Sequence, residues 1–198
     1  MNTVVDDYNE IRPWLDKEMG QFGLIGGPVL NIGMGLDGFW MDLKMAFRSQ
    51  TKKATGTPPS GMKGHREFKL MQNAFSWNVG FITGDRDGGI GFGLRSEFGG
   101  QKFKTRVYND GAEKGDWSEI FDDLMLNMGP MVKVVMIPSD GPTLTFASYY
   151  VFGLFENNMT EIAAMMNNNL DPYGDYPRYE NPNGIIGFNI TIGGALEL

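Results

Sequence analysis

Bulky apolar residues occupy every second position near the end of the chain, from Ile185 to Leu198. One face of this stretch carries Ile186, Phe188, Ile190, Ile192, Gly194, Leu196 and Leu198. The intervening positions are mostly small or polar. A period of two indicates a β-strand, because successive side chains of a strand point to opposite faces. The stretch is therefore predicted to be a strand with one strongly apolar face.

The same alternation recurs along most of the chain. It covers Phe22–Leu36, Phe39–Arg48, Arg66–Thr83, Ile90–Tyr108, Phe121–Ile137 and Thr143–Glu156. Most of these segments are about as long as the 9–11 residues that a tilted strand needs to cross a bilayer, and longer than ordinary globular strands. Seven strands are clear, and Thr3–Ile11 is the only candidate for an eighth. The sequence predicts an all-β protein.

The second face of the segments is rich in Gly, Ala, Ser and Asn. Glycine weakens a strand interior, so its repeated use needs a geometric reason, and close packing inside a narrow closed barrel supplies one. Charged residues on this face must then pair across the lumen, because a buried unpaired ion is costly. The expected lumen ion pairs involve Asp42, Lys44, Arg48, Arg95, Glu97, Lys133 and Glu197. The residues expected to face lipid are Phe39, Met41, Leu43, Phe92, Leu94, Phe188, Ile190 and Ile192.

Short and long connections alternate between the predicted strands. The short turns are Asp37–Gly38, Gly84–Gly88 and Pro138–Gly141, and the long ones are Thr51–His65, Asn109–Ile120 and Asn157–Asn183. Short turns on the periplasmic side and longer loops outside are typical of outer-membrane barrels. We expect residues 1–20 to form an N-terminal segment, a weak strand or a short helix, and residues 21–198 to form the barrel domain.

This pattern resembles the small outer-membrane β-barrel proteins of Gram-negative bacteria, most of all the porin-like eight-stranded families of the Bacteroidota, over about Gln21 to Leu198. The resemblance implies an antiparallel up-and-down transmembrane β-barrel of about eight strands in the bacterial outer membrane. It also implies contact with outer-membrane lipids and lipopolysaccharide. The terminal strand resembles the signal read by the barrel-assembly machinery, carried here by Phe188, Ile190, Ile192, Leu196 and Leu198. Bacterial barrels have even strand numbers, so either Thr3–Ile11 supplies the first strand, or a portion before Met1 that holds a signal peptide and a first strand is missing from the sequence.

Composition excludes several functions. The 17 Lys and Arg residues against 24 Asp and Glu residues give a net charge of −7, which disfavours nucleic-acid binding. The chain has no cysteine and a single histidine, so we expect no thiolate or multi-histidine metal site and no cofactor. His65, even with Ser60 and Glu67 nearby, is interpreted as a solvated loop histidine rather than a catalytic one. The segment Asp85–Gly89 lacks the spacing of a calcium loop and is interpreted as a turn.

Several loop and surface features keep two interpretations. A basic group on the Thr51–His65 loop either meets lipopolysaccharide phosphates or is merely solvated: Lys52, Lys53, Lys63, Arg66 and Lys69. An aromatic group either forms an interfacial girdle or packs ordinarily in the sheet: Trp40, Trp77, Trp117, Tyr149 and Tyr150. The Pro- and Tyr-rich stretch Asp171–Pro182, within the loop 157–183, either binds another envelope protein or plugs the barrel. A change of parity near Gly99 and Gly100 predicts a bulge, and Pro28 and Pro130 are expected at bulges or strand ends.

Two functions remain open. The first is an outer-membrane barrel with a filled lumen, which serves as a structural or accessory protein, or as a subunit of an envelope complex, and is not a general solute pore or an enzyme. The second is a soluble lipocalin-like barrel that binds an apolar ligand, with its bulky face pointing inward. A barrel enzyme acting on lipid A or peptides would need a polar constellation that the sequence does not show.

Overall fold

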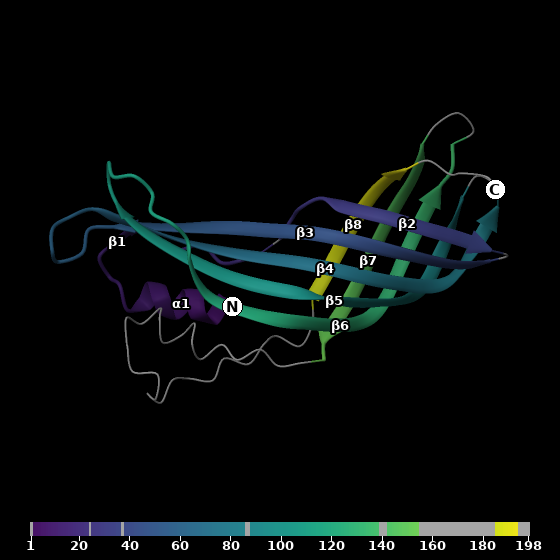
Figure 1. The fold of residues 1–198 in the computed structure, drawn as a ribbon, viewed down its shortest axis with the longest axis horizontal. Coiled ribbons are helices and arrows are strands. Elements are labelled where there is room, and N and C mark those ends of the chain that lie inside the picture. The colour runs from purple at the N-terminus through teal and green to yellow at the C-terminus, as the bar shows by residue number, and fades with distance from the viewer. Residues whose placement is uncertain are drawn as a thin grey trace.

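The computed structural model describes residues 2–23, 25–36, 38–85, 88–138, 142–154 and 185–193 (Figure 1). These residues form one helix and eight strands. In chain order they are α1 (Asn2–Glu10), β1 (Leu15–Lys17), β2 (Val29–Leu36), β3 (Phe39–Gly56), β4 (Gly64–Asp85), β5 (Gly88–Asn109), β6 (Ser118–Met136), β7 (Thr143–Gly153) and β8 (Ile185–Gly193). The N-terminal segment is thus a short helix followed by a short strand. No helix in the described part is long and apolar enough to span a membrane.

All eight strands belong to one antiparallel sheet, which confirms the predicted all-β up-and-down fold. The strand order is β1-β3-β4-β5-β6-β7-β8, and β2 also pairs with β3. Both β1 and β2 use the edge of β3 that β4 leaves open, β1 at Thr55 and Gly56 and β2 from Phe39 to Ala46. The sheet curls until its edge strands β2 and β8 approach within 8 Å between Cα atoms. Because six antiparallel pairings separate them, β2 and β8 run in the same direction.

The strands β3, β4 and β5 are longer than the sequence pattern predicted. β3 and β4 pair without interruption to Gly56 and Gly64, and β4 and β5 pair to Gly64 and Asn109. The predicted long loops Thr51–His65 and Asn109–Ile120 are therefore wrong in extent, since the connections are only residues 57–63 and 110–117. Figure 1 shows these strands extending well past β2, β7 and β8, with α1 beside the extended part.

We name two halves of this sheet. The turn half comprises β2, β7, β8 and the parts of β3–β6 that run from the short turns to Arg48, Phe75, Phe98 and Leu124, and the extension is the remainder of β3–β6 with α1 and β1. In the turn half the outer face is apolar: Phe81, Phe92 and Phe98 are 74%, 59% and 56% exposed. The inner face is polar or small, and Ser76, Asn78 and Arg95 are fully buried there. Bulky side chains therefore point away from the protein interior along this half.

The extension has the opposite arrangement. Its inner face carries Phe68 and Phe103, both fully buried. Their rings stack at 5.3 Å, and Tyr8 of α1 meets Phe68 edge-on at 5.4 Å. The outer face of this half carries charged side chains: Lys69, Lys102, Lys104, Arg106, Glu119 and Asp122. The extension is thus built like a water-soluble protein, with α1 covering its core.

The predicted bulge near Gly99 and Gly100 is wrong. Gly99 pairs with Ala74 and Gly100 with Asn73 in a continuous register, and inner and outer positions keep their parity. Near Gly99 and Gly100, the apolar residues change from the outer face of the turn half to the inner face of the extension. Pro28 directly precedes β2, as expected, whereas Pro130 lies inside β6 opposite Leu94, with no register shift at that point. The ladder between β6 and β7 omits Gly129 and Pro130 instead.

Truncating a leucine in the core of the extension should destabilise the protein. Leu70 is 3% exposed, whereas Leu124, on the outer face, is 65% exposed. We expect Leu70→Ala to lower the free energy of unfolding by about 2–5 kcal/mol, and Leu124→Ala to lower it by less than about 1 kcal/mol. Urea unfolding in detergent micelles measures both. Equal losses for the two variants would contradict the core assigned to the extension.

Candidate functional site

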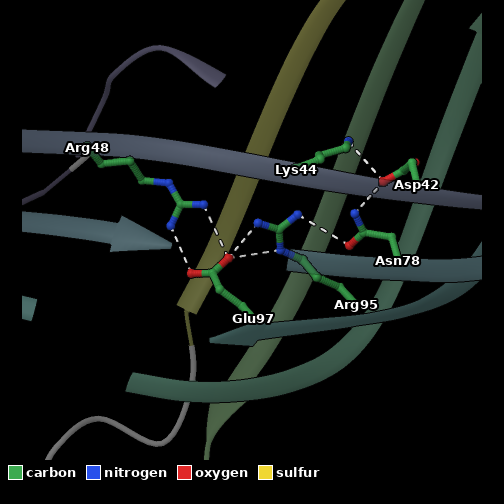
Figure 2. Close-up of polar contacts among 6 residues, drawn as sticks. All are labelled: Asp42, Lys44, Arg48, Asn78, Arg95 and Glu97. Carbon is green, nitrogen blue, oxygen red and sulfur yellow. Dashed lines mark hydrogen bonds and ion pairs between the residues drawn. The ribbon is translucent and has the colours of Figure 1, made fainter. Parts of the chain in front are cut away.

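The strand register gathers charged residues on the inner face of the turn half. Inner positions alternate along each strand, so Asp42, Lys44 and Arg48 of β3 share a face. Asp42 lies opposite Asn78 of β4, and Asn78 lies opposite Arg95 of β5. Six residues form this inner polar cluster together with Asn78: Asp42, Lys44, Arg48, Arg95, Glu97 and Lys133. Figure 2 shows five of them and Asn78 pointing toward one another from three strands.

Asp42 is one of the two carboxylates in the cluster. Its oxygens lie 3.9 Å from Lys44 Nζ and 3.6 Å from Lys133 Nζ. Asn78 Nδ2 also donates a hydrogen bond to Asp42 Oδ1. This carboxylate therefore connects β3, β4 and β6 through side chains.

Glu97 is the other carboxylate and is held by two guanidinium groups. Arg48 donates two hydrogen bonds to it, Nη1 to Oε1 at 3.0 Å and Nη2 to Oε2 at 3.2 Å. Arg95 donates to Oε2 from Nε at 3.0 Å and from Nη2 at 2.5 Å. Arg95 Nη1 also donates to Asn78 Oδ1 at 3.4 Å, which joins the two carboxylates into one network. Bidentate arginine–carboxylate contacts are the strongest pairs of this kind.

The inner polar cluster is positively charged and almost dry. Among the described residues it holds four cations and two carboxylates, and no side chain of the six is more than 11% exposed. Lys44 Nζ is buried without a hydrogen-bond partner in the described part of the chain. Buried ions require partners of opposite charge. The cluster therefore cross-links the inner face of β3, β4, β5 and β6.

Two aromatic side chains cover the cluster from inside. Lys133 Nζ lies 3.6 Å from the centre of a Trp40 ring, and the Arg95 guanidinium lies 4.2 Å from the centre of the Tyr149 ring. Both are cation–π contacts. Glycine makes room for these rings, because a Cβ on Gly91 would lie 2.9 Å from Trp40 Nε1 and one on Gly187 would lie 2.2 Å from Tyr149 Cζ.

Of the two interpretations of the aromatic group, the interfacial girdle is contradicted for two members. Trp40 and Tyr149 are 2% and 6% exposed and lie inside. Trp77 and Tyr150 lie on the outer face, 53% and 46% exposed. Trp117 lies in the 110–117 connection, with the Arg106 guanidinium 4.3 Å from its ring centre. The parity of the strands separates the first two residues from the others.

The side chains predicted to face lipid lie on the outer face. Seven of them are 41–68% exposed: Phe39, Leu43, Phe92, Leu94, Phe188, Ile190 and Ile192. Met41 is half-buried, and Asn189 on the inner face is 8% exposed. Glu197, Leu196 and Leu198 lie outside the described residues, as do the loop 157–183 and Asp171–Pro182 within it. The lipocalin-like alternative requires the opposite arrangement, with the bulky side chains inside.

A second charged cluster, centred on Glu67, lies on the outer face of the extension, and sequence reasoning missed it. Glu67 accepts hydrogen bonds from Tyr108 Oη at 2.7 Å, Arg106 Nη2 at 2.6 Å and Lys114 Nζ at 3.3 Å. Burial alone would raise the pKa of Glu67, but these hydrogen bonds and the charge of Arg106 together lower it to about 2. The cluster ties the 110–117 connection to β4 and β5.

The interpretation of the only histidine as a solvated loop residue is wrong, since His65 lies in β4 and its side chain is 10% exposed. His65 Nδ1 lies 2.9 Å from Thr55 Oγ1, and its Nε2 lies 3.3 Å from Asp110 Oδ1. Glu67 is held by the cations described above, and Ser60 makes no hydrogen bond to His65 in the described part of the chain. No group of three potential metal ligands occurs among the described residues.

Removing the charge of Glu97 should destabilise the turn half. Glu97→Gln leaves Arg48 and Arg95 buried without a counter-charge, so we expect a loss of about 3–5 kcal/mol in the free energy of unfolding. The matched control is Glu119→Gln, since Glu119 is 42% exposed and pairs with exposed lysines. The control should leave the urea midpoint in detergent unchanged. A similar midpoint for both variants would show that the inner cluster is not needed for stability.

The low pKa of Glu67 predicts acid sensitivity of the extension. The unfolded chain protonates Glu67 near pH 4.3, whereas the folded chain does so near pH 2. The stabilisation is therefore complete above about pH 4.3 and is lost as the pH falls toward 2. The difference in unfolding free energy between wild type and Glu67→Gln should shrink over this range. A difference that stays constant from pH 6 to pH 2 would contradict the assignment.

Comparison with known proteins adds no family. No protein-family model matches the chain. No curated protein and no solved structure matches it significantly. The function of the chain therefore rests on its own residues and geometry.

Proposed function

We propose that the chain is an outer-membrane β-barrel protein of a Gram-negative bacterium, of the porin-like kind that its sequence resembles. Its turn half lies in the bilayer and its extension projects from the outer surface. The barrel-assembly machinery inserts it, and outer-membrane lipids and lipopolysaccharide surround it. One observation supports this proposal most strongly. On the same strands, apolar side chains point outward in the turn half and inward in the extension.

The outer face of the turn half is difficult to reconcile with water. Exposed large apolar side chains occur on all seven long strands, and Ile32, Phe81 and Ile192 are 79%, 74% and 68% exposed. Soluble monomers rarely expose apolar patches of more than a few hundred Å². In a bilayer the same side chains meet hydrocarbon at no such cost. The band from Phe39 to Phe47 on β3 also has about the length that a tilted strand needs to cross the membrane.

The inner face supports a closed rather than a conducting barrel. The inner polar cluster spans β3, β4, β5 and β6, and Trp40 and Tyr149 fill the space beside it. Eight-stranded barrels have interiors just wide enough to be filled by side chains. We therefore assign a structural or accessory role, or that of a subunit in an envelope complex, without catalysis. Contact with another envelope protein through the loop 157–183 belongs to this proposal.

The lipocalin-like alternative has less support. A ligand-binding barrel of that kind needs an apolar interior, whereas the inner face of the turn half carries Asn78, Arg95 and Lys44, all fully buried. The apolar interior of the extension is occupied by Tyr8, Phe68 and Phe103 of the chain itself. No observation on the described residues favours an apolar ligand inside the sheet.

The loss of stability caused by an arginine on the outer face should depend on how deep its position lies in the bilayer. Leu94 lies inside the turn half and is 53% exposed. Leu124 lies at the border with the extension and is 65% exposed. An arginine at the bilayer midplane of a barrel costs about 2–4 kcal/mol, falling to about 0–1 kcal/mol near the interface. We expect Leu94→Arg to destabilise the protein in lipid vesicles by the larger amount and Leu124→Arg by the smaller.

The location itself has a direct test. The protein should fractionate with the outer membrane, require detergent for extraction and migrate differently on a gel before and after heating. Full solubility without detergent, together with equal effects of the two arginine substitutions, would refute the proposal.

A further inference from the structure

A cavity of about 300 Å³ lies in the extension, between the N-terminal segment and the ends of β3, β4 and β5. Its walls include Tyr8 from α1, Arg12 and Trp14 from the segment after α1, and His65 and Arg66 from β4. None of the described residues that line it is acidic. The cavity lies outside the apolar band, on the half of the molecule that is built for water. Pockets of this size accommodate small organic molecules.

Two guanidinium groups converge on one ring in this cavity. The Arg12 guanidinium lies 4.0 Å and the Arg66 guanidinium 5.8 Å from the centre of the Tyr8 ring. Arg66 is half-buried and makes no hydrogen bond or ion pair with the described part of the chain. Burial lowers the pKa of Arg12, and the charge of Arg66 adds to this effect. The cavity therefore presents concentrated positive charge, and Arg66 offers guanidinium donors that the described part of the chain does not use.

The remaining walls are suited to a small polar molecule with a flat apolar side. The half-buried Trp14 supplies aromatic surface, and Thr55, Ser60 and Asn109 supply hydroxyl and amide groups. Guanidinium groups bind phosphate through several parallel hydrogen bonds. We propose that this cavity binds a phosphorylated monosaccharide, either free or as the headgroup of a lipid. Arg66 would bind the phosphate, and the aromatic and hydroxyl side chains would contact the sugar.

This inference does not depend on the membrane location, because the cavity belongs to the extension. The test uses the full chain in detergent and isothermal titration calorimetry with glucosamine 1-phosphate. We expect binding of glucosamine 1-phosphate, at least tenfold weaker binding of glucosamine, and at least tenfold weaker binding of inorganic phosphate. Equal affinities for glucosamine and its phosphate would overturn the proposed phosphate site. Equal affinities for inorganic phosphate and the sugar phosphate would overturn the sugar contact.

Variants test the residue assignment. Arg66→Gln should weaken the binding of glucosamine 1-phosphate at least tenfold. Lys69→Gln, which removes the same charge from the same strand but outside the cavity, should leave it unchanged. Unchanged binding by Arg66→Gln, or equal loss in both variants, would overturn the role of Arg66. Because the comparison of ligands uses wild-type protein alone, a folding defect in Arg66→Gln does not remove the test.

A second arm identifies the source of the ligand. Vesicles with lipid A and vesicles without it are each tested for their ability to displace bound glucosamine 1-phosphate from the protein. Competition by lipid A vesicles alone supports a lipid headgroup as the ligand. Binding of the sugar phosphate without such competition supports the free compound. Competition by both kinds of vesicle would overturn recognition of a phosphorylated sugar at this cavity.

Discussion

Burial of large apolar side chains drives folding, and in this chain those side chains lie on opposite faces of the same strands in the two halves. In the extension they point inward, where Phe68 and Phe103 pack beneath Tyr8 of α1. In the turn half they point outward, where the described chain offers no second layer to cover Phe92 or Ile190. The continuous register of β4 and β5 shows that no bulge exchanges the faces. In the proposed location, lipid around the turn half and water around the extension account for this difference.

The outward apolar face leaves the interior of the turn half to polar groups, which must satisfy one another. Glu97 between Arg48 and Arg95, and Asp42 beside Lys133, provide the counter-charges. Removing one partner of a buried ion pair costs far more stability than the intact pair contributes. Such a network therefore acts mainly to specify one arrangement of the strands. Glycine on the inner face belongs to the same design, since it leaves the space that the large rings covering these ions occupy. The filled interior thus follows from the outward apolar face.

Much of this arrangement could be predicted from alternation alone. Parity assigns Asp42, Arg95 and Lys133 to one face and Phe92 and Leu94 to the other, because a strand has only two faces. Alternation could not predict the extension, since there the same parity continues while the apolar face changes sides. Alternation also places Trp40 on the face of Asp42, although residue type alone favours an interfacial position. Contacts between distant strands and connections, such as Glu67 with Lys114, leave no periodic signal in the sequence.

The central claim, that the outer face of the turn half contacts lipid, can be measured with two tryptophans that lie on opposite faces of neighbouring strands. Single-tryptophan variants that retain only Trp77 or only Trp40 would be reconstituted in vesicles of brominated lipids, which quench fluorescence on contact. Trp77 is 53% exposed on the outer face, and Trp40 is 2% exposed within the interior. The account predicts strong quenching of Trp77 and little quenching of Trp40. Quenching of Trp40 with Trp77 unaffected, or no quenching of either, would contradict it.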